Sequence, residues 1–101
     1  MNIKDVLSCI SEINPDALLA DGFDDAIIGI GNQHGTESLV IYDRTKCIDI
    51  LAKKFSKNDH PYIDAVEYFE YNVAGAYLGK GTPIFMDTIE DLSESLWYET
   101  D

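Results

Sequence analysis

Two short runs of apolar, β-branched residues, 26–30 and 38–42, limit what this chain can fold into more than any other feature. Such side chains favour strands, because they pack well on a pleated surface and lose rotamer freedom in a helix. The polar stretch 31–36 between the runs contains two glycines and has the length of a hairpin loop. Gly29, inside the first run, predicts a bulge or a close backbone approach. The sequence therefore predicts a β-hairpin over 26–42.

Helical periodicity precedes this hairpin. Apolar residues in the segment 2–14 recur at spacings of three and four, which is typical of an amphipathic helix, and Asn2 can cap it. The residues of this stripe are Val6, Cys9, Ile10 and Ile13. Pro15 suits the first position of a new helix with Asn14 as its cap, so a short second helical piece is expected to run to Gly22.

Two further helices are expected after the hairpin. Asp43 can cap the first of them. Its apolar face is predicted to comprise Cys47, Ile48, Leu51 and Phe55. Pro61 opens a longer helix, which Gly79 is placed to end after Leu78. The inward stripe of this longer helix is predicted to comprise Tyr62, Val66, Phe69, Val73, Ala76 and Tyr77.

A third strand, 83–86, and a last helix complete the pattern. The last helix has two candidate capping boxes, Asp87 with Glu90 and Thr88 with Asp91. It is expected to bury Ile89, Leu92 and Leu96. We therefore predict an α+β fold and a single compact domain, 1–101, because this length supports one core. Its small, mainly antiparallel three-stranded sheet combines the hairpin 26–42 with strand 83–86 and packs with about four helices.

The net charge excludes several classes of partner. Nineteen Asp and Glu against seven Lys and Arg give −12, and such a chain repels phosphate, so direct nucleic-acid binding is not expected. The apolar runs are too short to cross a bilayer, and the first residues lack a signal-peptide pattern, so we expect no membrane association and a cytoplasmic location. Two cysteines make no disulfide framework.

Residues that could support catalysis or bind a metal are scattered. The cysteines and histidines stand alone in the sequence, at Cys9, Cys47, His34 and His60, without the paired spacing of a zinc site. Cys47 falls on an apolar helical face, which favours core packing over a nucleophile. We predict no catalytic residue, metal or cofactor. The alternative is a small enzyme or ligand-binding domain that uses the loop 31–36, with His34 and either Asp25 or Asp43 as its polar groups.

The distribution of charge is the most informative feature for function. Five of the seven basic residues lie between Arg44 and Lys57, whereas residues 58–101 contain ten acids and only Lys80. The outward side of the longer helix combines acids with tyrosine rings, a mix that protein interfaces favour. The residues predicted to bind a partner are Asp64, Glu67, Tyr68, Glu70, Tyr71, Glu90, Asp91 and Glu94. A solvated acidic surface and tyrosines that lie partly in the core stay open as alternatives.

Four segments, 17–31, 40–51, 65–79 and 81–85, are similar to those of a known group of proteins. Together they resemble a group of short proteins encoded by tailed bacteriophages, and the resemblance covers roughly residues 17–86. It implies a phage-encoded protein acting in the cytoplasm of a bacterial host. Many small acidic proteins in that setting inhibit host enzymes or defence systems.

These observations lead to one favoured hypothesis. The chain is expected to be an acidic binding protein, an inhibitor that occupies a basic surface of a host or defence protein, in particular a surface evolved for nucleic acid. Carboxylates on a rigid helix can imitate a row of phosphates. A homodimer formed through the tyrosines is a third interpretation.

Overall fold

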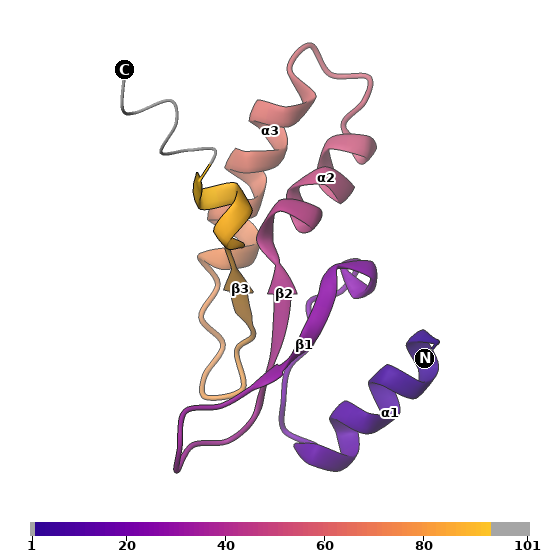
Figure 1. The fold of residues 1–101 in the computed structure, drawn as a ribbon. Coiled ribbons are helices and arrows are strands. Elements are labelled where there is room, and N and C mark those ends of the chain that lie inside the picture. Colours follow the sequence, from indigo (N-terminus) through magenta and orange to yellow (C-terminus); the bar gives the residue numbers. More distant parts are fainter. Residues whose placement is uncertain (1, 94–101) are drawn as a thin grey trace.

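The computed structural model describes residues 2–93 and contains a three-stranded sheet (Figure 1). Strands β1 (Ile27–Gly31), β2 (Leu39–Asp43) and β3 (Ile84–Met86) lie side by side in that order. β1 and β2 form the predicted antiparallel hairpin, whereas β3 pairs with β2 in parallel. The predicted α+β class and three-stranded sheet are confirmed, and the sheet has one antiparallel and one parallel pair.

The parallel pairing follows from the path of the chain. Helix α2 (Arg44–Lys54) leaves the end of β2, and α3 (Pro61–Tyr68) returns beside it in the opposite direction (Figure 1). The segment 75–83 then carries the chain back to the end of the sheet where β2 begins. β3 therefore enters the sheet in the direction of β2.

The predicted bulge is present in β1. The pairing with β2 shifts between Ile27 and Gly29, which leaves Gly29 opposite Ile41. Gly31 lies opposite Leu39, and a Cβ atom added to Gly31 would come within 2.9 Å of Cδ1 of Ile41. Glycine at this position therefore lets the Ile41 side chain lie across β1.

Two helix caps form as predicted. Helix α1 (Ile3–Ile13) begins after Asn2, whose side-chain oxygen accepts a hydrogen bond from the Asp5 backbone N–H at 2.9 Å. The carboxylate of Asp43 accepts one from the Lys46 backbone N–H at 3.2 Å and caps α2. Both bonds satisfy backbone donors that a helix start leaves free.

The expected helix from Pro15 to Gly22 is wrong. The chain forms a turn after Asn14, runs without helical structure through 17–20, and makes only a short 3-10 helix, η1 (Asp24–Ala26). The Leu18 N–H donates to the Gly81 carbonyl at 3.0 Å, and the Ala20 N–H donates to the Tyr42 hydroxyl at 2.8 Å. These long-range partners replace the local hydrogen bonds of a helix.

The longer helix also differs from its prediction. After α3 the chain continues as a π-helix, η2 (Phe69–Ala74), and leaves it at Gly75, so Gly79 does not end the helix. A Cβ atom on Gly75 would lie 2.6 Å from the Glu70 carbonyl oxygen, which explains a glycine at this tight exit. Tyr77 therefore lies beyond the helix and is 76% exposed, although it was expected inside. Tyr62, in the first turn of α3, was also expected inside and is 55% exposed.

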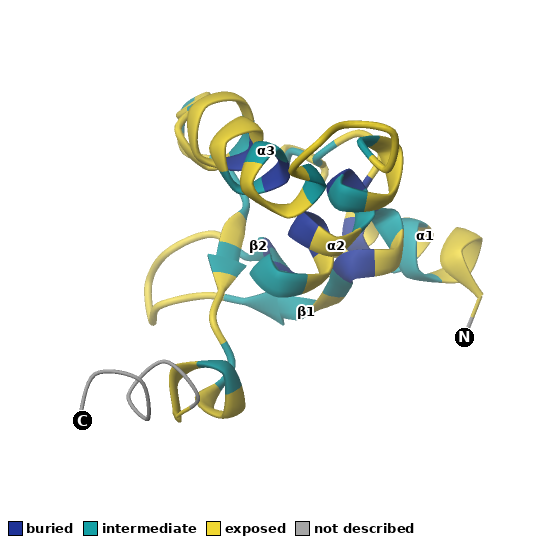
Figure 2. Cartoon of the chain, turned by 90° about the horizontal axis from the view of Figure 1, so that it is seen from above, coloured by how far each residue is buried: buried dark blue, intermediate teal, exposed yellow. Residues whose placement is uncertain are grey.

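The core lies on one face of the sheet, under α2, α3 and η2 (Figure 2). Its buried residues are Ile10, Phe23, Ala26, Val40, Tyr42, Cys47, Ile48, Leu51, Ala65 and Phe69. Phe85 of β3 packs against two of these rings, with centroids 5.5 Å from Tyr42 and 5.1 Å from Phe69. The predicted buried face of α2 is confirmed for Cys47, Ile48 and Leu51, and Phe55 is partly buried.

Three apolar residues expected in the core lie at the surface instead. Ile13 is 58% exposed at the end of α1. Residues 89–93 are helical, but Ile89 and Leu92 are 83% and 50% exposed, because this helix lies outside the core that the sheet forms with α2, α3 and η2 (Figure 2). Leu96 lies outside the described residues. Within 2–93, no helix combines the length and apolar character needed to cross a membrane.

Candidate functional site

The outward side of α3 and η2 presents acids and an aromatic ring to solvent. Ala65 and Phe69 are buried on the inward side, against α2 and the sheet. On the outward side Glu67 is exposed and the Tyr71 side chain is 83% exposed. The Asp64 carboxylate is partly buried and accepts a hydrogen bond from the Asn58 side-chain amide at 3.0 Å. The structure thus brings three of the predicted partner-binding residues together.

Tyr68 borders this group, since it follows Asp64 by four residues and precedes Tyr71 by three. Its ring packs edge-on against Phe55 of α2, with centroids 5.7 Å apart, and it is 45% exposed. It also lines a pocket of about 340 Å³ between η2, the end of α2, the segment 18–23 and the segment 76–85. Lys54 and Asn72 are among the polar residues of this mainly apolar pocket. Tyr68 is therefore engaged in part as a contact between α2 and α3, unlike the more exposed Tyr71.

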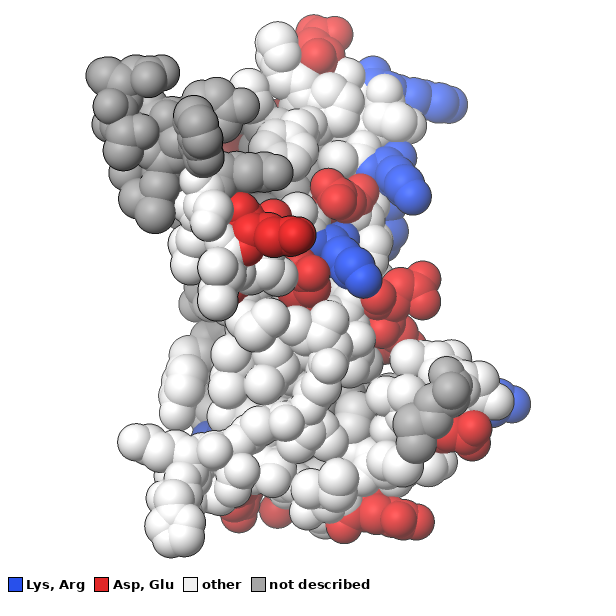
Figure 3. Space-filling view, in the orientation of Figure 1, with Lys and Arg blue, Asp and Glu red and all other residues white. Residues whose placement is uncertain are grey.

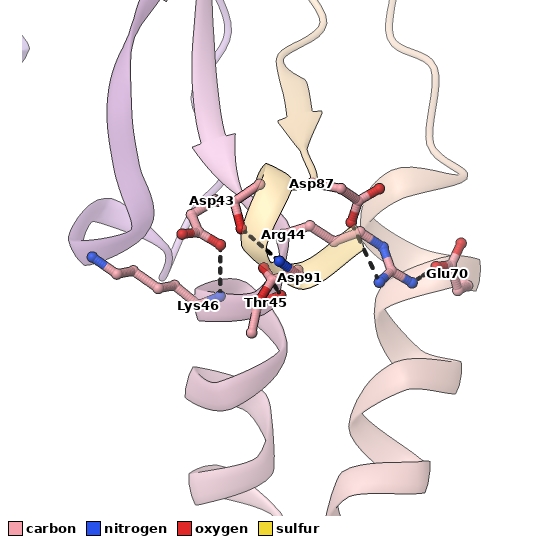
Figure 4. Close-up of polar contacts among 8 residues, drawn as sticks. Asp43, Arg44, Thr45, Lys46, Glu70, Asp87 and Asp91 are labelled. Atoms are coloured by element: carbon pink, nitrogen blue, oxygen red, sulfur yellow. Dashed lines mark hydrogen bonds and ion pairs between the residues drawn. The ribbon is translucent and has the colours of Figure 1, made fainter. Parts of the chain in front are cut away.

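Glu70 is held by an ion pair (Figure 4). Its carboxylate accepts a hydrogen bond from the guanidinium of Arg44, the first residue of α2. Arg44 also lies 3.9 Å from the Asp87 carboxylate and 5.5 Å from the centroid of the Phe69 ring. The bond to Glu70 raises the pKa of Arg44. Glu70 consequently joins η2 to α2 and is not a free anion.

Sequence reasoning missed this role of Arg44, although a signal was present. A cation at the first position of a helix opposes the helix dipole, so it needs nearby acids to be stable there. Glu70 lies 26 positions further along the chain, and only the fold brings it within reach.

Asp91 is also engaged by the fold. The Thr45 hydroxyl donates to its carboxylate at 2.8 Å, and its own N–H donates to the Thr88 hydroxyl at 3.1 Å (Figure 4). Thr88 is therefore the residue that caps helix 89–93. Glu90 is exposed in this helix, and Glu94 lies outside the described residues. The predicted set thus divides into exposed acids and acids that hold helix 89–93 and η2 against the start of α2.

The structure separates the residues of the alternative loop site. The carboxylate of Asp43 caps α2 at the end of β2, whereas the loop with His34 lies before the start of that strand. Asp25 is exposed in η1. The loop 31–36 does border a hollow on the sheet, but His34 is not among the residues that line it. These three side chains therefore form no common site.

The buried cysteine lies in the core. Cys47 is fully buried in α2, and its burial raises the pKa of the thiol to about 12. A thiol with that pKa stays protonated near neutral pH, so it is a poor nucleophile. Within residues 2–93, no group of three or more His, Cys, Asp or Glu side chains is placed to hold a metal ion.

Charge is distributed unevenly over the surface. In Figure 3 most Lys and Arg side chains lie over α2, and Asp and Glu side chains lie around them and at the opposite end of the molecule.

Comparison of the chain with known protein families, curated proteins and solved structures found no match. The chain's own residues therefore carry the functional argument.

Proposed function

We propose that the chain is an acidic binding protein whose outward helical side docks on a basic surface of another protein. We call this side the α3 face and define it by Ile63, Asp64, Glu67 and Tyr71. The observation that carries the proposal is the 83% exposure of Tyr71 on the same side as two carboxylates. A tyrosine ring supplies contact area at low entropic cost, and carboxylates steer a basic partner toward it.

The packing beneath the face supports this assignment. Phe69, two positions before Tyr71, is fully buried, so the backbone that carries Tyr71 is fixed to the core. Ile63, which is 56% exposed, adds apolar area one turn before Glu67. A face held in place before binding loses little conformational entropy on association.

The overall charge supports a basic partner. A net charge of −12 attracts cationic surfaces over distances of about 10 Å at moderate salt. Nucleic-acid-binding surfaces are basic because they neutralise phosphates. The resemblance to phage-encoded proteins extends the proposal to a partner of the bacterial host or its defence, met in the host cytoplasm, where the chain would block that surface.

The test captures partners from a bacterial lysate with immobilised protein and two matched variants. Tyr71→Ala removes the ring from the α3 face, whereas Tyr77→Ala removes a similarly exposed ring, at 76%, from the segment after η2. We expect the wild type and Tyr77→Ala to capture the same basic protein and Tyr71→Ala to lose it. Salt should weaken this capture. Equal capture by the two variants would contradict the proposal.

A further inference from the structure

The sheet has a second, apolar face that no described helix covers. Leu39 and Ile41 of β2 and Ile84 and Met86 of β3 lie on this side, because they alternate with the buried residues of their strands. We call these four residues the open face. Ile84 and Met86 are 41% and 37% exposed, and none of the four packs against the core.

The open face is hollowed. Gly29 and Gly31 of β1 lie opposite Ile41 and Leu39 and place no side chain over them. The hollow measures about 910 Å³ and extends from Ile41 and Ile84 to the loop after β1. Helix 89–93, with its exposed Ile89 and Leu92, projects on the side of the molecule away from α3 (Figure 2). Apolar residues gathered on one exposed face are typical of an interaction site.

Charge decides which partner fits. In Figure 3 the middle of the surface over the strands is uncharged, and Asp43, at the end of β2 on this side, is engaged as the cap of α2. Two chains of −12 repel each other, and they can approach most closely where neither presents a charge. A basic partner, by contrast, finds no carboxylate among the four residues of the open face. The open face thus suits a second copy of this chain better than it suits the target proposed for the α3 face.

The rim of the hollow is complementary to itself. Glu37 and Lys80 are the two charged residues among those that line it, and neither forms an ion pair within residues 2–93. In a two-fold interface, contacts between unlike residues occur twice, once in each direction. Glu37 of one copy can therefore pair with Lys80 of the second while the reverse pair also forms.

We propose that two copies of the chain associate through their open faces, with Ile41 and Ile84 at the centre and Glu37 paired with Lys80 at the rim. Face-to-face packing of two small sheets is a common way to bury such surfaces. The α3 face stays free in this dimer, since it lies on the other side of the core. The dimer is therefore independent of the function proposed above.

Sedimentation velocity of the full chain tests the dimer over about a hundredfold range of concentration. Ile84→Glu places a carboxylate on the open face, and Ile63→Glu makes the same change at an exposed isoleucine of α3. We expect dimers for the wild type and for Ile63→Glu. The dissociation constant of Ile84→Glu should be at least about tenfold larger than that of the wild type. Circular dichroism checks that all three fold.

Charge reversal tests the rim. Lys80→Glu should weaken the dimer, and the double change Glu37→Lys with Lys80→Glu should restore it, because the pair is then reversed in both places. A wild type that sediments as a monomer at every concentration would overturn the proposal, as would equal dissociation by Ile84→Glu and Ile63→Glu. Failure of the double change to restore association would contradict the rim pairing.

Discussion

The hydroxyl of Tyr42 accepts a hydrogen bond from the backbone N–H of Ala20 at 2.8 Å, although the Tyr42 residue is fully buried. This bond joins the middle of the sheet to a segment without helices or strands, 17–20. The same segment is held at Leu18 by the Gly81 carbonyl. The walls of the 340 Å³ pocket therefore depend on contacts far apart in the sequence.

Tyr42→Phe should lower the free energy of unfolding by about 1–2 kcal/mol, because the Ala20 N–H loses its partner while the ring stays in place. Urea denaturation measures this loss. Tyr62→Phe, at a residue 55% exposed, is the control and should change stability by less than about 0.5 kcal/mol. Equal stability of Tyr42→Phe and the wild type would show that water satisfies Ala20.

Phe69→Ala should lower stability by about 3–5 kcal/mol, since it removes a fully buried ring that packs on Phe85. Phe69→Asp and Val73→Asp bury a charge and should abolish folding or nearly so. Tyr71→Ala, on the opposite side of the same helix, should be nearly neutral. Thermal melts compare the variants, and a cooperative wild-type melt for Phe69→Asp would contradict the core assignment.

Stability should fall at alkaline pH. Burial raises the pKa of Cys47 from 9.0 to about 12 and also raises the pKa of Tyr42. Above pH 9 the unfolded chain therefore binds fewer protons than the folded chain, so the stability present below pH 9 is lost as the pH rises toward about 12. Urea titrations across this range should show the loss.

Cys47→Ala separates the thiol from other alkaline effects. At neutral pH it should lower stability by about 1 kcal/mol and leave binding unchanged, because the thiol only fills space in the core. Its loss of stability above pH 9 should be shallower than that of the wild type. Intact folding with loss of all binding would instead give Cys47 a functional role.

Arg44→Met should lower stability by only about 0.5–1 kcal/mol, because the Arg44 and Glu70 side chains are 30% and 49% exposed to solvent. The loss should shrink at high salt. Lys46→Met, at an exposed residue in the same turn of α2, is the matched control. An equal effect of the two changes would show that the pairs with Glu70 and Asp87 contribute nothing specific.

The elements predicted correctly are those fixed by neighbours in sequence. Asn2 and Asp43 cap helices within three residues of themselves, and the strands need only their β-branched runs. Pro15 carries an equally clear local signal, yet the segment after it is held by Gly81 and Tyr42, which no local pattern reveals. Long-range hydrogen bonds override propensity there.

The candidate site was predictable to the extent that exposure follows from helical spacing. Glu67 and Tyr71 lie outside as expected. The roles of Glu70 and Asp91 could not be predicted, because their partners, Arg44 and Thr45, belong to a helix that only the fold brings near. Tyr77 also lies outside, because the helix ends at Gly75, two residues before it, and not at Gly79 as predicted.

The affinity of the captured partner for wild type, Tyr71→Ala and Tyr77→Ala tests the α3 face most directly. Truncating a central anchor should cost about 2 kcal/mol of binding or more, so Tyr71→Ala should bind weakly while Tyr77→Ala binds as the wild type does. Adding Asp64→Lys and Glu67→Lys should slow association and flatten its salt dependence. Unchanged affinity and salt dependence in these folded variants would contradict the α3 face as the binding surface.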